Sequence, residues 1–117
     1  MPRSLPAPEM IHSILNSYNF DISKCVDYFI EELGFDGAVV FRDKPNFEMA
    51  YHFHKSDSYL YMLDGESLLD IDSQVTVYKK WDFCIVPKGL IHAVRPGKWG
   101  KYIIATEDGN FESILID

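Results

Sequence analysis

The sequence predicts an all-β domain, a sandwich or barrel, that is preceded by a short helical segment. Aromatic residues make up 15% and apolar residues 47% of the 117 residues, enough to build a core from side chains that favour strands. From Gly37 onward, short apolar runs alternate with polar or Gly/Pro turns, as they do in all-β proteins. Helical spacing of apolar residues is confined to the part before Gly37.

The first 36 residues are expected to form an arm and helices that pack on a barrel formed by residues 37–117. The first eight residues contain three prolines and should be extended. Residues 9–17 carry apolar side chains at helical spacing, with His12 on the exposed side. A second helix should begin after Asp21, whose side chain can cap it, and stop at Gly34.

Strands in the second part are expected wherever an apolar run lies between two turns. One of these turns is expected at Gly65 and Glu66, between two apolar runs. The expected strands are residues 38–42, 46–54, 59–64, 67–72, 74–79, 83–87, 91–96, 101–106 and 111–116.

The charge balance disfavours two classes of partner. The net charge is −7, so nonspecific binding to nucleic acid or to an anionic membrane is not expected. The sequence shows neither an apolar run long enough to span a bilayer nor a signal-peptide pattern, so we expect a cytoplasmic protein. Cys25 and Cys84 are too few for a disulfide framework and are interpreted as buried apolar residues.

Three histidines stand in a pattern that suggests a metal site. His52 and His54 are two residues apart, so on a strand both side chains point to the same face. His92 follows a turn at Pro87 and Gly89, which would hold it in place at the start of the next strand. Three imidazoles brought to one point can hold a divalent metal ion. The alternative is that each is an ordinary polar histidine on a half-exposed strand.

These residues resemble the two motifs of the cupin superfamily. Two histidines and a glycine match the first motif, and the pattern Pro-x-Gly-x-x-His matches the second in type and spacing. The matching residues are His52, His54, Gly65, Pro87, Gly89 and His92. The resemblance covers roughly residues 38–106, and the short interval between the motifs is similar to that of compact, single-domain, RmlC-like cupins. It implies a double-stranded β-helix, or jelly-roll barrel, with a small-molecule site at its mouth.

The sequence departs from the cupin pattern at four positions. Ser58 stands where the family usually has a glutamate ligand. Asn46 and Trp81 replace the glycines that usually begin the two motifs, and Pro96 replaces a common asparagine. Without the glutamate, three neutral imidazoles leave the ion with its full charge and more open positions. Asp57 would supply a carboxylate only if the loop shifted, because its side chain should otherwise point the opposite way.

Several further residues are candidates for the pocket or for contacts behind the metal ligands. They are Asp57, Ser58, Tyr59 and Tyr61. Tyr59 and Tyr61 share one face of a strand and Leu60 lies on the other, so one of these faces must look inward. Arg95 is expected in solvent, because an ideal strand directs it to the face opposite His92.

The sequence is compatible with three functions. The first is a small metalloenzyme acting on a small organic molecule through a three-histidine Fe(II) site, with Zn, Mn or Ni as alternative ions. The resemblance to three-histidine cupins such as thiol dioxygenases implies dioxygenase-like chemistry. The second is a non-catalytic cupin that senses or binds a ligand or metal, and the third is a structural barrel whose histidines bind nothing. A C2 homodimer is expected, because an amphipathic helix and aromatic-rich strands offer apolar surface to a second copy.

Overall fold

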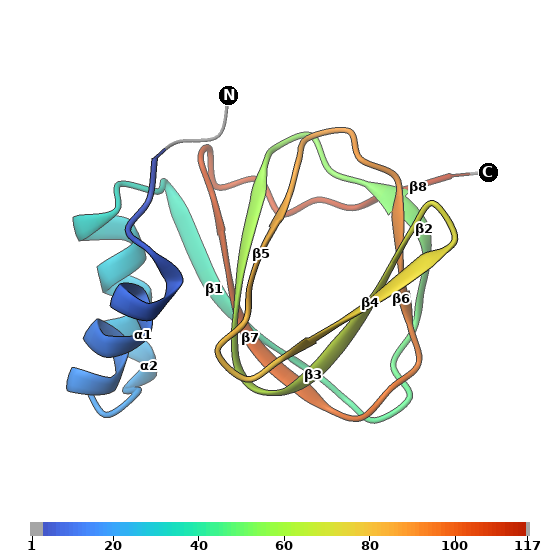
Figure 1. Ribbon diagram of the computed structural model, residues 1–117. Helices are drawn as coiled ribbons and strands as arrows, with labels where there is room; N and C mark the ends of the chain where they lie inside the picture. The colour runs from blue at the N-terminus through green and yellow to red at the C-terminus, as the bar shows by residue number, and fades with distance from the viewer. Residues whose placement is uncertain (1–3, 117) are drawn as a thin grey trace.

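A computed structural model describes residues 4–116 of the chain (Figure 1). Two helices and a π-helical turn precede an antiparallel sheet. In chain order the elements are α1 Pro8–Ser17, α2 Ile22–Asp27, the π-helix Tyr28–Glu32, β1 Gly37–Asp43, β2 Met49–Phe53, β3 Ser58–Ile71, β4 Gln74–Lys79, β5 Phe83–Val86, β6 His92–Arg95, β7 Gly100–Thr106 and β8 Ile114–Leu115. The first three residues of the expected N-terminal arm, and the last residue of the chain, lie outside the described residues.

Strand β3 is shared by the two halves of the sheet. Its residues 58–61 pair with both β5 and β7, whereas residues 66–71 pair with β4 and, in part, with β6. The hydrogen-bonded order is β1-β7-β3-β6-β2-β8, with β4 and β5 each joined to β3. Seen end-on, the sheet curls into a half-barrel (Figure 1). The predicted double-stranded β-helix is confirmed.

The turn expected at Gly65 and Glu66 is wrong, because β3 runs through both residues. Gly65 has a φ of +70°, which glycine adopts without a steric penalty. A Cβ atom there would lie 2.1 Å from the carbonyl oxygen of Trp99. The register between β3 and β7 also shifts between Met62 and Asp64. Such an irregularity bends a strand, and the bend carries β3 from one half of the sheet to the other.

Side-chain alternation along β3 divides the buried residues between two clusters. Tyr59 and Tyr61 point out of the barrel and pack with the helices. Leu60 and Met62 point into the barrel, where they pack with Leu69 from the far end of the same strand. The sequence left open which face of this strand looks inward, and it is the face of Leu60.

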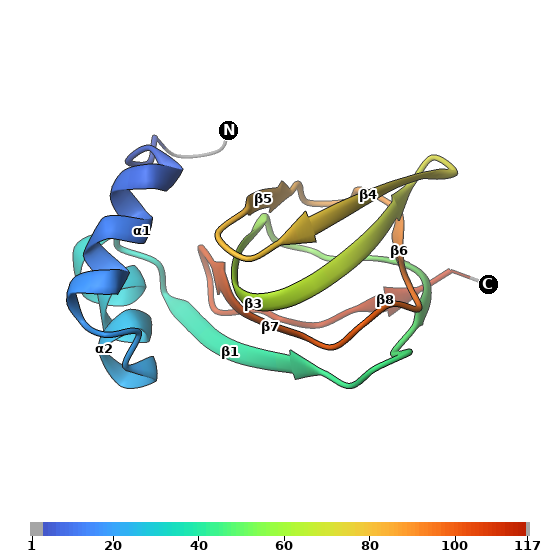
Figure 2. The same ribbon diagram turned by 60° about the horizontal axis from the view of Figure 1, so that its bottom comes forward.

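The helices cover one side of the barrel, next to β1 (Figure 2). Ile11 and Leu15 of α1 are fully buried on that side. Asp21 caps α2 as predicted, since its side chain accepts a hydrogen bond of 3.0 Å from the backbone N–H of Lys24. Gly34 follows the π-helix with a φ of +79°, in keeping with the predicted stop.

The expectation that His12 is exposed is wrong. Its Nδ1 atom lies 2.8 Å from the hydroxyl oxygen of Tyr61. Its ring centroid lies 4.2 Å from that of Trp81 and 5.6 Å from that of Phe20. His12 therefore belongs to the contact between α1 and the barrel.

Other expected strands differ from the structure mainly at their ends. The second strand begins at Met49 rather than at Asn46, whose φ of +63° does not suit a strand. The last strand comprises only Ile114 and Leu115.

No helix within residues 4–116 is long and apolar enough to cross a bilayer.

Candidate metal centre

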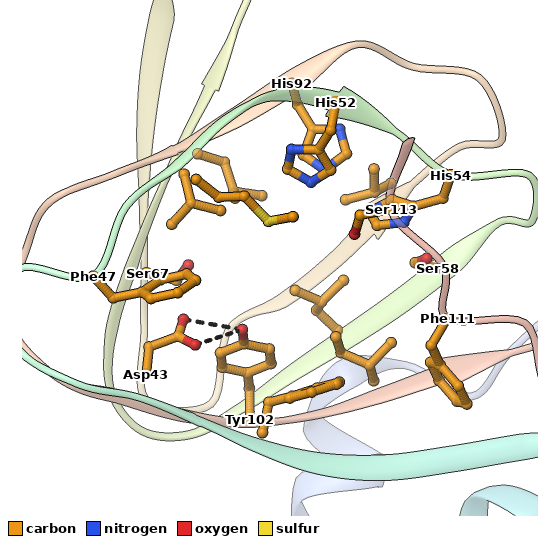
Figure 3. Close-up of a pocket in the computed structure, with 17 residues that line it drawn as sticks. Asp43, Phe47, His52, His54, Ser58, Ser67, His92, Tyr102, Phe111 and Ser113 are labelled. Atoms are coloured by element: carbon orange, nitrogen blue, oxygen red, sulfur yellow. Dashed lines mark hydrogen bonds between the residues drawn. The ribbon is translucent and has the colours of Figure 1, made fainter. Parts of the chain in front are cut away.

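Three histidines meet inside the barrel (Figure 3). Their ligand atoms all lie within 4.8 Å of one another. His52 on β2 and His92 on β6 are register partners, with ring centroids 4.2 Å apart. His54 directly follows β2, and its ring centroid lies 5.1 Å from each of the other two. The structure thus brings together the three histidines that the sequence singled out.

Each imidazole is oriented by a backbone carbonyl group. The Nδ1 atoms of His52, His54 and His92 lie 2.7, 3.0 and 2.9 Å from the carbonyl oxygens of Ala50, Glu112 and Leu90. A carbonyl oxygen can only accept a hydrogen bond, so each Nδ1 atom must carry the proton and donate it. The Nε2 atom of each ring then has a free lone pair, as a metal ligand requires.

The surroundings of His52 and His92 favour the uncharged form of these two rings. Burial lowers the pKa of His52. Burial, aided by the charges of the two neighbouring histidines, lowers the pKa of His92 to about 4. Neutral imidazole is the form that binds a metal ion. At neutral pH these two rings therefore need not release a proton before they can act as ligands, and the donor set fits a divalent ion.

A cavity of about 240 Å³ opens beside the histidines. Its other polar lining groups are Asp43, Tyr102, Ser58, Ser67 and Ser113. The remaining lining residues are apolar: Phe41, Phe47, Met49, Leu60, Leu69, Val86, Val94, Ile104 and Phe111. Among the described residues that line the cavity there is neither a lysine nor an arginine. These walls suit a small, mostly apolar organic molecule.

Of the four further residues nominated from the sequence, Ser58 lines the cavity and the other three do not. Tyr59 and Tyr61 are fully buried on the opposite face of β3, beneath the helices, because successive side chains on a strand alternate. Asp57 precedes β3, and its carboxylate accepts a hydrogen bond of 2.7 Å from the backbone N–H of Lys88. Asp57 therefore ties two loops together.

Sequence reasoning missed a second polar pair in the cavity, Asp43 and Tyr102. The Tyr102 hydroxyl lies 2.9 and 3.1 Å from the two carboxylate oxygens of Asp43 and donates its proton to them. Figure 3 shows this pair across the cavity from the histidines. Alternation along β7 could have placed Tyr102 beside Ile104, but the inward face was not known. Asp43 lay just beyond the expected end of the first strand.

The sequence suggested that Arg95 stands alone in solvent, but the structure shows it paired with other side chains. Its guanidinium group donates hydrogen bonds to the carboxylate of Asp70 and to the hydroxyl of Tyr51. Its neighbour Val94 lines the cavity, so Arg95 lies on the outer face of β6, as alternation requires. It is therefore committed to an ion pair outside the cavity.

A cupin-domain family model matches residues 39–97, which is half of the chain. The chain belongs to the cupin family. No curated protein sequence matches this cupin.

Solved structures share the fold of this cupin. The polyketide cyclase RemF from Streptomyces resistomycificus matches with a TM-score of 0.61 and 18% identity, over 69% of this chain and 60% of the cyclase. An uncharacterised double-stranded β-helix protein from Klebsiella pneumoniae has a TM-score of 0.59 and 22% identity, over 69% of this chain and 74% of its own. Bacillus subtilis oxalate decarboxylase, which has Mn(II) centres, has a TM-score of 0.61 and 20% identity, over 73% of this chain and 25% of its own. This cupin thus spans less than two thirds of the cyclase and a quarter of the decarboxylase.

In this cupin, the two positions where family motifs usually begin with glycine keep a glycine-like backbone. Asn46 has a φ of +63° and Trp81 a φ of +76°. Asparagine tolerates this conformation, but a bulky side chain pays a steric cost of roughly 1–2 kcal/mol. The Trp81 ring is the one that packs against His12, at an interplanar angle of 45°. The strained position therefore supplies a contact that joins the barrel to α1.

Proposed function

We propose that this cupin binds a divalent metal ion through His52, His54 and His92, and that the ion holds a small, mostly apolar organic molecule in the adjoining cavity. The observation that carries the proposal is the matching hydrogen bond at all three Nδ1 atoms. Three rings fixed in the same tautomer present three Nε2 lone pairs to one region. A set of histidines that merely fills a core has no need of this common orientation.

We further propose Fe(II) as the ion and dioxygenase-like catalysis as the activity, with Zn, Mn or Ni as alternative ions. A bound divalent ion polarises the donor atoms of an organic ligand, and iron adds redox chemistry. Ser58 supplies a neutral hydroxyl on the cavity wall, so the donor set carries no charge and leaves positions open. The apolar walls would hold the organic molecule and exclude water from it. The Mn(II) centres of oxalate decarboxylase support metal binding on this fold.

The placement of the ionisable side chains favours a second candidate, a non-catalytic cupin that senses or binds a small molecule. Ser58 and Ser113 are the polar residues labelled on the His54 side of the cavity in Figure 3. The carboxylate of Asp43 lies on the opposite side. A general acid or base must reach the proton that it transfers, and hydroxyl groups are poor substitutes at neutral pH.

Metal content tests the proposal. Untagged wild type, His54→Ala and His92→Ala would be loaded anaerobically with Fe(II), desalted together and measured for iron per chain. We expect a stoichiometric content in the wild type and a loss of most of it in both variants. His12→Ala is the matched control, because it removes a histidine outside the cluster and should keep its iron. Equal iron in wild type and His92→Ala would refute the ligand assignment.

Oxygen consumption separates the two candidate functions. The iron-loaded wild type would be mixed with panels of small apolar alcohols, thiols and diketones while dissolved oxygen is recorded. Consumption that disappears in His92→Ala supports the dioxygenase-like enzyme. Binding of a panel member without consumption, seen as a shift in the spectrum of the metal, supports the sensor.

A further inference from the structure

The cavity has two polar ends separated by apolar walls. The histidines form one end, and the Asp43–Tyr102 pair forms the other (Figure 3). The proposed metal site uses only the first end. A molecule that reaches across the cavity from the histidines must therefore meet the second end as well.

The second end accepts hydrogen bonds. A carboxylate has about four lone-pair positions, and the Tyr102 hydroxyl occupies part of them. Burial raises the pKa of Tyr102, and the charge of Asp43 raises it further, so the phenol keeps its proton and keeps donating it to Asp43. The remaining lone pairs of Asp43 are free to accept a hydrogen bond from a bound molecule.

The described residues that line this cavity give a negative charge at this end no cation to pair with. The described lining residues include neither lysine nor arginine. Arg95 and Lys98 line a second, smaller pocket behind Asp43, and Arg95 is held there by Asp70. A carboxylate or phosphate placed beside Asp43 would lose its hydration and face a like charge.

We propose that Asp43 determines which organic molecule the cavity binds. The end of this molecule that lies away from the histidines is neutral or cationic. It carries a hydroxyl, amine or amide N–H that donates a hydrogen bond to the carboxylate of Asp43. This inference rests on the proposed function, because it describes the ligand of that same cavity. It assigns a specificity role to Asp43 and a positioning role to Tyr102, which holds the carboxylate in place. The cavity should therefore not bind a molecule with two acidic groups if one of them would lie beside Asp43.

Three matched probes test the inference without any metal. Benzyl alcohol, benzylamine and benzoate share one ring and differ in the charge and donors of one substituent. Each would be titrated into metal-free protein at pH 7.5, and the dissociation constant read from the NMR shifts of Asp43 and Tyr102. We expect benzoate to bind at least about tenfold more weakly than benzyl alcohol, because it donates no hydrogen bond and repels Asp43.

Two variants attribute the effect to Asp43. Asp43→Asn keeps the shape of the side chain and removes its charge. It should therefore weaken benzylamine binding about tenfold and reduce the difference in affinity between benzyl alcohol and benzoate. Asp72→Asn is the control for net charge, since Asp72 is an exposed turn residue outside the cavity; it should change neither affinity appreciably. Tyr102→Phe should weaken benzyl alcohol binding less than Asp43→Asn does.

Three results would overturn the inference. They are benzoate binding as tight as that of benzyl alcohol in the wild type, an unchanged benzylamine affinity in Asp43→Asn, and no shift at Asp43 or Tyr102 with any probe. A failure of metal loading would refute the proposed metal site and leave this order of affinities intact. The two failures are therefore distinguishable.

Discussion

The Nδ1 atom of His54 lies 3.0 Å from the carbonyl oxygen of Glu112, a residue 58 positions further along the chain. His54 is the least buried of the three histidines, so this contact is its main restraint. Glu112 is held in turn by Asn110, whose side-chain oxygen accepts a hydrogen bond of 2.9 Å from the Glu112 backbone N–H. The segment after β7 therefore sets the orientation of one proposed ligand.

Asn110→Ala should lower the metal affinity about tenfold, the lower end of the range for groups behind a ligand. The variant removes the hydrogen bond that fixes Glu112 and leaves all three histidines in place. Competition with a chromogenic chelator would measure the affinity. Asn16→Ala, an exposed change on α1, serves as the control. An affinity equal to that of wild type would mean that the Glu112 carbonyl keeps its position without Asn110.

Ser58 gives a second prediction. Ser58→Ala should leave metal content nearly unchanged, because a neutral hydroxyl is a poor ligand. Ser58→Glu should tighten binding by about tenfold or more, equivalent to about 1.4 kcal/mol, because it returns an anionic ligand to the position where cupins usually have one. Metal per chain after identical loading and desalting would be compared.

The control for Ser58→Glu is Ser67→Glu, which adds the same charge to the cavity on the side of Asp43 rather than of the histidines (Figure 3). This variant should not tighten binding. A large loss of metal in Ser58→Ala would show that the serine is itself a ligand.

The stability of the metal-free protein should decrease with acidity because of His92. Its pKa falls from the ordinary value of 6.5 to about 4 in the folded protein. Between these values the unfolded chain binds a proton that the folded protein does not, so the free energy of unfolding decreases as the pH falls from about 6.5. The loss should amount to roughly 1–3 kcal/mol near pH 4 and vanish above pH 7.

Urea unfolding of wild type and His92→Gln at pH 7.5 and pH 5.0 would measure this effect. Titrating groups outside the histidine cluster contribute equally to both proteins, so the comparison reports on His92 together with its coupling to His52 and His54. An identical loss of stability in the two proteins would contradict the prediction.

Trp81 allows backbone strain to be separated from aromatic contact. Both Trp81→Ala and Trp81→Gly remove the ring contact with His12, but only glycine relieves the strain at a φ of +76°. Trp81→Gly should therefore be more stable than Trp81→Ala by about 1 kcal/mol. Thermal or urea unfolding would measure the difference. If alanine is the more stable, the left-handed backbone at this position carries no strain.

The sequence was most informative where spacing alone decides the structure. Residues two apart on a strand share a face, so His52 and His54 had to point together, and the turn before His92 marked the start of another strand. The motifs likewise indicated the jelly-roll barrel. These inferences need only local geometry and a familiar pattern.

Features that depend on distant packing could not be predicted in this way. Alternation shows that Tyr59 and Leu60 are on opposite faces, but only the placement of the helices shows that Tyr59 faces them. His12 appeared exposed because its partners, Tyr61 and Trp81, lie far away in the sequence. The homodimer expected from the apolar surface stays a prediction.

The pairing of β3 has a consequence for how the chain folds during its synthesis. Ser58 on β3 pairs with Thr106 on β7, and Asp70 near the other end of β3 pairs with Ala93 on β6. Both partners leave the ribosome long after β3 itself. Because contacts between distant residues slow folding, the nascent chain must wait with Leu60 and Met62 covered only in part, by β5 and Leu69, until β7 is available. Ribosome-bound chains that end before residue 92 should therefore be cut readily by protease and should attract chaperones that bind apolar segments.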